Sequence, residues 1–183
     1  MSVEMLVCHC SPTLAGLKTG SLFSCPYSSQ KMIIKEIREF NQKLTQKGIR
    51  IIPVRISDKR MLVYVYRPEK LKEDFSDEKT QIILKCKGYD CTNLSQCICR
   101  LIQKLQSDPD FPHEIGLFLG YPAEDVKGFI ENKAACSKCS GCWKVYGDEQ
   151  AARILFKKYK KCTEIYCRRW KSGVAVEQLT ITI

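Results

Sequence analysis

The strongest constraint on the fold is a pair of strand-like runs in the first half of the chain. Residues 49–56 and 61–67 are rich in β-branched and aromatic side chains, which favour extended structure. Only the short polar segment 57–60 separates them, so the chain has room for little more than a tight reversal. The sequence therefore predicts a β-hairpin over 49–67. Because strands joined by a hairpin are antiparallel, a purely parallel sheet is excluded.

Apolar residues at helical spacing dominate much of the remaining chain. One stripe comprises Ile33, Ile37, Phe40 and Leu44 and ends at Gly48. The longest stripe follows Asp148 and comprises Ala152, Leu155, Tyr159, Cys162 and Tyr166. Both repeat every three or four residues, as the buried face of an amphipathic helix does. The chain is therefore predicted to contain a long helix in its C-terminal half.

Shorter helices are predicted from their end signals. Pro68 suits the first position of one helix, Asp77 caps a second that ends at Gly88, and Thr92 caps a third. A further helix carries Val126, Phe129 and Ile130. The two prolines of the segment 108–112 interrupt this helical region.

Three segments outside the hairpin are predicted to be extended. Ile115–Leu119 is a short apolar run typical of a buried strand. The alternation of apolar residues and threonines in Val174–Ile183 predicts a half-exposed final strand. The segment around Cys8 and Cys10 is also interpreted as extended.

These elements predict an α+β or α/β fold. A length of 183 residues is typical of one domain, and no linker or internal repeat divides the chain, so residues 1–183 are expected to form a single domain. Because helices and strands are interleaved around the 49–67 hairpin, we expect a mixed β-sheet flanked by several helices.

Composition excludes several classes of protein. Hydrophobic residues make up 44% and charged residues 27%, which is unlike a disordered chain. No secretory signal and no apolar run of the roughly 18 residues that span a membrane is visible, so a cytoplasmic protein without a membrane partner is expected. The 12 cysteines are then expected to be reduced, which points to metal binding, thiol chemistry or packing. Cys86, Cys97 and Cys162 are interpreted as small core residues on helices.

One group of cysteines has the spacing of metal ligands. Cys136, Cys139 and Cys142 form a C-x2-C-x2-C run around Gly141, and thiolates so spaced can bind zinc or an iron–sulfur cluster. Cys162 is the candidate fourth ligand. Neighbouring lysines also favour a redox-reactive group of thiols. The alternative is that these cysteines are reduced loop and packing residues.

A second constellation combines a thiol with an imidazole. Cys10 is a candidate nucleophile, His113 its candidate base and Glu114 the candidate carboxylate that orients the base. Adjacent residues on an extended chain point to opposite faces, which makes Glu114 a poor partner for His113. The alternative is structural, with His113 and Glu114 anchoring a loop. Whether the protein is an enzyme is therefore left open.

The net charge of +10 is concentrated late in the chain. Basic residues occupy one face of the predicted long helix, namely Arg153, Lys157, Lys160, Lys161 and Arg168. Such a face suits an acidic protein partner or nucleic acid. No nucleic-acid-binding signature is present to decide between them. A solvated helix face is the alternative interpretation.

Four segments give the chain a resemblance to a known family. They are His9–Gly16, Val63–Pro68, Phe111–Pro122 and Trp143–Tyr146. Through them nearly the whole chain resembles an uncharacterised bacterial family, found mainly in anaerobic Gram-positive species and known as a domain of unknown function. The resemblance implies a setting of redox or iron physiology, in which an acidic flavoprotein would be a suitable partner. The leading hypothesis is therefore a thiol-rich metal-binding or redox-associated protein, with the Cys10 enzyme and the interaction protein as alternatives.

Overall fold

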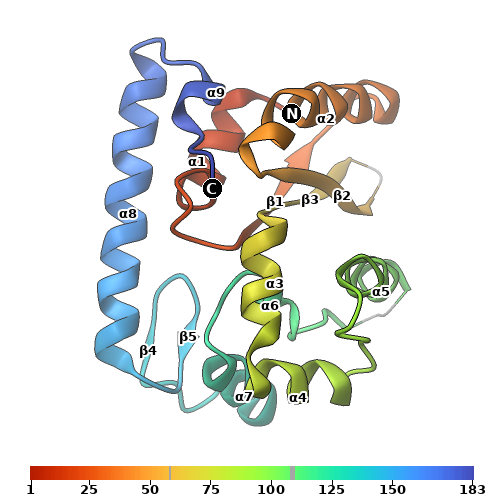
Figure 1. Cartoon of the computed structure of the whole chain (residues 1–183), viewed down its shortest axis with the longest axis vertical. Coiled ribbons are helices and arrows are strands. Elements are labelled where there is room, and N and C mark those ends of the chain that lie inside the picture. The colour runs from red at the N-terminus through yellow and green to blue at the C-terminus, as the bar shows by residue number, and fades with distance from the viewer. Residues whose placement is uncertain (58, 108–109) are drawn as a thin grey trace. The chain divides into compact units, whose positions relative to one another are not determined.

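The computed structural model describes the chain except for positions 58 and 108–109, which include part of the predicted turn and part of the predicted interruption. Contacts divide the chain into two compact units, whose elements are drawn in Figure 1. The first unit contains Met1–Glu69 and Tyr159–Ile183, and the second contains Lys70–Lys158. This division into units does not test whether the chain is a single domain, which stays a prediction.

The predicted combination of helices with a β-hairpin is confirmed. Strands β2 (Arg50–Ile56) and β3 (Arg60–Tyr66) form the hairpin, and the three-stranded sheet has the order β1-β3-β2. Both strand pairs of this sheet are antiparallel, so the fold is α+β, and the parallel component of a mixed sheet is not found among the described residues. The hairpin register shifts between Pro53 and Arg55, where proline offers no donor to the ladder.

Strand β1 (Gly20–Pro26) pairs with β3 along its whole length, from Gly20 opposite Tyr66 to Pro26 opposite Arg60. The sequence did not predict this strand. Its two serines, Ser21 and Ser24, dilute the apolar pattern, and β1 becomes a strand because β3 presents a full row of backbone partners to it. Two neighbours place β3 in the centre of the sheet.

The N-terminal segment is a helix, and its interpretation as extended was wrong. Helix α1 (Val3–Leu14) begins at Ser2, whose side chain accepts a hydrogen bond from the Met5 amide at 3.2 Å. Leu6, Cys10 and Leu14 follow at intervals of four residues and are fully buried. That spacing gives the helix an apolar face. The interpretation as extended considered only Cys8 and Cys10 and missed this four-residue spacing.

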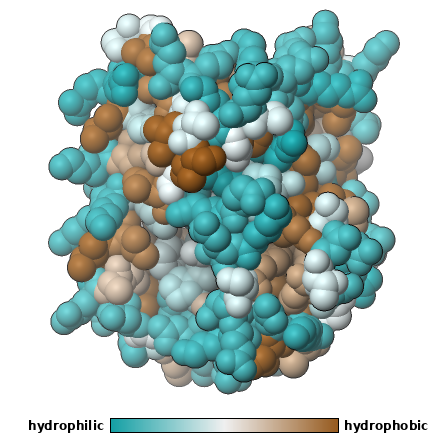
Figure 2. Space-filling view, in the orientation of Figure 1, coloured by the Kyte–Doolittle hydropathy of each residue, from teal (hydrophilic) through white to brown (hydrophobic). Residues whose placement is uncertain are grey.

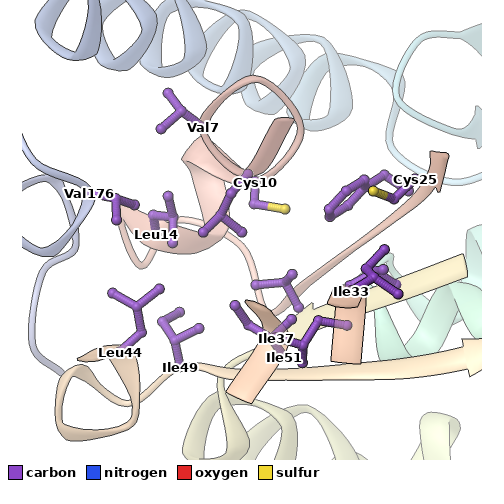
Figure 3. Close-up of a cluster of buried hydrophobic side chains, with 14 of the residues drawn as sticks. Val7, Cys10, Leu14, Cys25, Ile33, Ile37, Leu44, Ile49, Ile51 and Val176 are labelled. Carbon is purple, nitrogen blue, oxygen red and sulfur yellow. The ribbon is translucent and has the colours of Figure 1, made fainter. Parts of the chain in front are cut away.

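The first unit has a core on one face of its sheet. Helix α2 (Gln30–Leu44) continues into a short 3-10 helix, η1 (Thr45–Lys47), and ends at Gly48 with a φ of 75°, as predicted. Figure 3 shows side chains of α1, β1, α2 and β2 converging in this core. Val63 and Val65 of β3 belong to the same cluster.

The C-terminal segment does not form the predicted strand. Residues Val176–Leu179 form a short helix, α9, and the backbone after it bonds to a helix end. The Ile181 amide donates to the Leu14 carbonyl at 3.1 Å. The alternation of Leu179, Ile181 and Ile183 therefore reflects contacts with α1 and its surroundings, because a two-residue period gives no information about whether a partner strand exists.

Helices make up most of the second unit. The elements after the sheet are α3 (Pro68–Ser76), α4 (Glu78–Cys86), α5 (Leu94–Ser107), α6 (Ile115–Phe118), α7 (Ala123–Asn132) and the start of α8 (Glu149–Lys171). Pro68, Asp77 and Asp148 lie at the helix starts that the sequence predicts. For α5 the cap is Asn93, which accepts from the Ser95 and Gln96 amides, and Thr92 bonds to Asp90 instead.

Residues 115–118 are helical, so the strand predicted over Ile115–Leu119 was wrong. All five residues are buried, and a short apolar run of this kind fits the period of a strand or of a helix equally well. The helix packs closely on α7. A Cβ atom on Gly116 would lie 2.7 Å from Val126 of α7, so only glycine allows this approach.

Arg67 follows β3 and is the most extensively bonded buried cation of the first unit. Its guanidinium donates to the carbonyls of Thr13 (2.7 Å) and Leu14 (2.7 Å) at the end of α1. It also donates to the carbonyls of Lys47 (3.0 Å) in η1 and Ile181 (2.9 Å) near the C-terminus. The residue is 2% exposed. One side chain therefore satisfies carbonyls from three separate segments.

We expect Arg67→Met to lower the free energy of unfolding by about 3 to 5 kcal/mol, because it leaves buried carbonyls without donors. Urea denaturation followed by circular dichroism measures the loss. Arg55→Met is the matched control, since Arg55 is exposed on the neighbouring strand, and its effect should stay within about 0.5 kcal/mol. Equal effects of the two substitutions would contradict the role assigned to Arg67.

Candidate functional site

The cysteine loop folds into a small hairpin. Strands β4 (Cys139–Ser140) and β5 (Lys144–Val145) pair antiparallel, and the Lys138 amide donates to the Val145 carbonyl at 2.8 Å. Cys136 and Cys142 are exposed, while Cys139 is half-buried. The chain enters the hairpin through left-handed backbone at Ala134 and Cys136, with φ values of 68° and 58°.

A buried carboxylate attaches this hairpin to α7. Asp125 accepts hydrogen bonds from the Trp143 indole (2.7 Å) and from the amides of Tyr146 (2.7 Å) and Gly147 (2.8 Å). The Trp143 ring stacks on Tyr121 at 4.7 Å. The hairpin is thus held by charge-assisted hydrogen bonds and aromatic packing.

The geometry adds no support to the predicted metal site. Among the described residues, no group of three or more His, Cys, Asp or Glu side chains is placed to hold a metal ion. The candidate fourth ligand, Cys162, is buried on the part of α8 that belongs to the other compact unit. Zinc or an iron–sulfur cluster at Cys136, Cys139, Cys142 and Cys162 therefore stays a prediction.

The candidate nucleophile Cys10 lies inside the first core. Its side chain is fully buried among apolar residues (Figure 3), and burial raises the pKa of its thiol far above the ordinary value. Lys18 and a hydrogen bond with Ser21 lower this pKa but do not offset burial. His113 belongs to the second unit. A thiol that is hard to ionise and shielded from solvent is poorly suited to attack a substrate.

His113 and Glu114 have separate environments. His113 is exposed, and its ring packs edge-on against Phe129 at 4.9 Å. Glu114 is buried and forms an ion pair with Lys104, at 2.7 Å between Nζ and Oε1. The Tyr89 hydroxyl donates to the same carboxylate oxygen at 3.1 Å. Glu114 therefore holds a structural ion pair, as in the alternative interpretation of this segment.

Two opposing effects set the pKa of Glu114. Burial raises it, and the hydrogen bonds and charge of Lys104, together with other donors, lower it; the net pKa lies below the ordinary value. The carboxylate is therefore ionised in the folded protein at neutral pH. Such a group stabilises the fold above its unfolded pKa, and this contribution is lost as pH falls through the folded pKa.

The basic residues of α8 are exposed as predicted. Arg153 bonds to Glu149 one turn earlier on the same helix, at 2.7 Å. At 100° per residue, Glu164 lies within the stripe that Lys157, Lys160, Lys161 and Arg168 define. The positive face is thus interrupted by one carboxylate, and its densest part is the last turn, where Arg168, Arg169 and Lys171 follow one another closely.

A thiol pair that the sequence did not predict lies in the first unit. The Sγ atoms of Cys8 on α1 and Cys167 on α8 are 3.6 Å apart. Cys8 is exposed and Cys167 is half-buried. The two residues are 159 positions apart, so no local spacing could have indicated the contact. Cys167 belongs to the rim of the core of this unit, where Tyr166 and Trp170 also pack.

Among the remaining cysteines, Cys91 and Cys97 share a side-chain hydrogen bond. Each cysteine of the chain lies in the described part and is a free thiol. Cys97 and Cys162 are buried, as predicted, but Cys86 is exposed at the end of α4, so its assignment to the core was wrong. Helix α4 buries Thr80 and Leu84, and Cys86 points away from that face.

Comparison with known proteins bears on the whole chain. Residues 6–180 match the family described as protein of unknown function (DUF3793). The chain belongs to the DUF3793 family. This family corresponds to the uncharacterised domain family that the sequence resembles. No curated protein and no solved structure matches the chain. Function in this DUF3793 protein therefore has to be inferred from its own residues.

One face of this DUF3793 protein is mainly polar. Figure 2 shows hydrophilic side chains over most of the visible face, with smaller apolar patches between them. None of the helices in the described residues is long and apolar enough to cross a bilayer. Exposed apolar residues nevertheless occur, among them Ile82 on α4, with 57% of its surface exposed.

We expect Lys104→Met to cost about 3 to 5 kcal/mol of unfolding free energy near neutral pH, because Glu114 would then be a buried carboxylate without a countercharge. The contribution of Glu114 to the free energy of unfolding should also change in the opposite direction with pH. In the wild type, the contribution of Glu114 is lost on acidification, whereas in the variant burial alone raises the Glu114 pKa and acidification restores stability. Urea denaturation between about pH 7 and pH 4 measures both effects.

The double variant Lys104→Met/Glu114→Gln is the control for this experiment. It removes both charges, so it should be more stable than Lys104→Met at neutral pH and should lack the reversed pH dependence. If the single and double variants had the same pH profile, the Lys104–Glu114 pair would not account for it.

Proposed function

We propose that this DUF3793 protein is a thiol redox protein in which Cys8 and Cys167 alternate between a dithiol and a disulfide. The distance of 3.6 Å between their Sγ atoms carries the proposal. Both side chains are accessible, Cys8 more than Cys167, so a small oxidant can reach them. The proposal keeps the redox hypothesis and assigns it to thiols other than those of the 136–142 loop.

Geometry favours a direct bond between these two thiols. A disulfide has an S–S length of about 2.05 Å, so the sulfur atoms need to approach by about 1.5 Å. Rotation about the side-chain torsions and a small adjustment of the helices supply a movement of this size. Cys91 and Cys97 also share a side-chain hydrogen bond, but Cys97 is buried, whereas Cys8 is exposed and Cys167 half-buried. The Cys8–Cys167 pair is therefore the more accessible of the two to an oxidant.

The two thiols have different roles in the proposed exchange. The exposed Cys8 thiolate attacks a low-molecular-weight disulfide, RSSR, which gives a mixed disulfide and releases one RS⁻. The Cys167 thiolate then attacks the Cys8 sulfur and releases the second RS⁻. The protein loses two electrons and two protons overall, and RSSR becomes two RSH. Each sulfur–sulfur bond that breaks is replaced by one that forms.

Cys167 suits the second step. Burial raises the pKa of its thiol, and the adjacent Cys8 raises it further, while Lys171 lowers it. Cys167 is therefore mainly protonated near neutral pH and reacts when the mixed disulfide brings the Cys8 sulfur beside it. Because only the thiolate attacks, this step becomes faster as pH rises.

Oxidation would also connect distant parts of the chain. The bond joins α1 to the second half of α8 and closes a loop of residues separated by 159 positions. In the chain-entropy description, a cross-link over a loop of this length stabilises the folded state by about 4 to 5 kcal/mol, less any strain. The redox state would therefore control the stability of the first unit.

A second observation favours an acidic partner for this reaction. Arg168 and Lys171 are exposed within one turn of Cys167 on α8, and Arg169 lies between them. Positive charge beside a thiol attracts anionic reaction partners and stabilises the thiolate. The acidic partner predicted from the basic helix, for which a flavoprotein is one example, would thus meet the protein at the end of α8 that carries Cys167.

We expect oxidised dithiothreitol or oxidised glutathione to form the Cys8–Cys167 disulfide before other cysteines are modified, because these sulfur atoms are already in contact. Alkylation of the remaining thiols followed by peptide mass mapping identifies the bond. Cys8→Ser and Cys167→Ser should abolish this cross-link, and Cys99→Ser, which removes an exposed cysteine of α5, should leave it unchanged. Recovery of alkylated Cys8 and Cys167 alongside oxidised cysteines elsewhere would overturn the proposal.

The rate of exchange should depend on the charge of the oxidant. Oxidised glutathione is anionic and 2-hydroxyethyl disulfide is neutral, so the ratio of their rate constants should fall severalfold when ionic strength rises from about 0.01 M to 0.5 M. Stopped-flow measurement of mixed-disulfide formation gives this ratio. Arg168→Gln/Lys171→Gln should lower the ratio at low salt.

Lys157→Gln/Lys158→Gln is the matched control on the same helix. Lys157 lies about 15 Å from Cys167 along the helix axis, so its charge acts on this thiol from farther away than Arg168 and Lys171 do, and the control should lower the ratio less. A wild-type ratio that did not respond to salt would argue against an electrostatic contribution from the end of α8.

A further inference from the structure

A cavity of about 760 Å³ lies in the second unit. Its walls come from the end of α4, from α5, from the segment 110–114 and from the end of α7. Lys87, Lys104, Phe111, His113, Phe129 and Lys133 are among its lining residues. The volume falls in the range of small-molecule sites.

The interior of this cavity is held by the Lys104–Glu114 ion pair. Lys104 also donates to the Lys87 carbonyl at 2.7 Å, so a single ammonium group joins α5 to the end of α4 and to the segment 110–114. The Tyr89 ring lies beneath this ammonium group, which is 4.6 Å from the ring centroid. These contacts give the cavity a fixed wall before any ligand arrives.

The charge that faces the cavity is positive on balance. Lys104 neutralises Glu114, which leaves Lys87 and Lys133 against Asp110. Lys87 and Lys133 are exposed, and neither has an ion pair among the residues that the structure describes. Lys133 holds a left-handed backbone conformation, with a φ of 45°, which is unfavourable for a residue other than glycine. The cavity therefore offers an anion two ammonium groups with no competing carboxylate bonded to them.

A second, apolar cavity of about 470 Å³ adjoins the first between α4 and α7. Ile82, Ile83 and Ile130 supply its apolar lining. Lys87 and Ile130 line both cavities, so the two spaces are neighbours at these residues. Lys127 of the second cavity forms an ion pair with Glu131, at 3.8 Å, so this pair adds no net charge. A cationic compartment thus lies beside an apolar one.

We propose that the two neighbouring cavities bind a small anionic amphiphile, whose carboxylate or phosphate group contacts Lys87 and Lys133 and whose hydrocarbon body passes Lys87 and Ile130 to lie between α4 and α7. A purely ionic ligand would leave the apolar compartment filled with water, and a purely apolar one would leave the two ammonium groups without a partner. Complementarity to both compartments is what selects an amphiphile. This site is independent of the Cys8–Cys167 pair, which lies in the other unit.

Isothermal titration calorimetry of the full-length protein with a matched set of probes tests the site. Decanoate and decyl phosphate carry both chemical features, acetate and inorganic phosphate carry only the charge, and decanol carries only the hydrocarbon. All are used below their aggregation concentrations. Decanoate or decyl phosphate should bind at least about 100-fold more tightly than acetate or phosphate, since each buried methylene adds about threefold to fourfold. Their relative affinities identify the preferred head group.

Variants separate the two compartments, and all replace exposed residues so that the fold is retained. Lys87→Gln/Lys133→Gln should weaken decanoate binding at least about tenfold without changing any binding of decanol, because a lost charge contact matters only to an anion. Ile82→Ser should weaken decanoate binding severalfold and leave acetate unaffected. Lys85→Gln is the matched control, because Lys85 is exposed one residue before the end of α4 and does not line either cavity.

Two results would overturn the proposal. One is the absence of measurable binding for both decanoate and decyl phosphate in a protein whose circular dichroism shows it to be folded. The other is equal binding of decanol and decanoate that none of the variants changes, which would indicate non-specific adsorption to exposed apolar surface or to a protein-docking face.

Discussion

The Arg67 guanidinium is the contact on which the first unit depends. A helix leaves its last carbonyls without partners, and here one cation bonds the carbonyls of Thr13 and Leu14 at the end of α1, Lys47 in η1 and Ile181 near the C-terminus. Burial lowers the pKa of Arg67, with a partial offset from Tyr166. The negative ends of the two helices stabilise the charge in place of a carboxylate.

The thiol pair is a consequence of this arrangement. Fixing the end of α1 beside the C-terminal segment fixes the position of Cys8, and the second half of α8 packs on the same core through Tyr166 and Trp170. Cys8 and Cys167 meet where these two helices adjoin. The proposed redox reaction would therefore act on a contact between helices that are already held by packing and by backbone bonds, so little reorganisation accompanies it.

The second unit uses buried charge in a related way. Asp125 collects an indole and two amides and attaches the 139–145 hairpin to α7, while Lys104 joins α5 to Glu114 and to the Lys87 carbonyl. Each charge is satisfied by several partners, which limits its cost of desolvation. The spacing of Cys136, Cys139 and Cys142 fits a turn of this hairpin as well as it fits a metal site. The same Lys104 contact shapes the cavity that we assign to an anionic amphiphile.

The sequence by itself determined the elements whose signals are local. The 49–67 hairpin, the helix that stops at Gly48, the caps at Asp77 and Asp148 and the exposed basic residues of α8 all depend on neighbours within a few positions, so pattern and propensity suffice. Tertiary structure decided the rest. Residues 115–118 form a helix in which Gly116 packs closely on Val126, and the end of the chain bonds through its backbone to α1 and Arg67 and not to a strand. Long-range packing also decides which groups a buried charge or a thiol contacts. Cys8 and Cys167 are separated by 159 positions, so they could be paired only once the helices that carry them were placed.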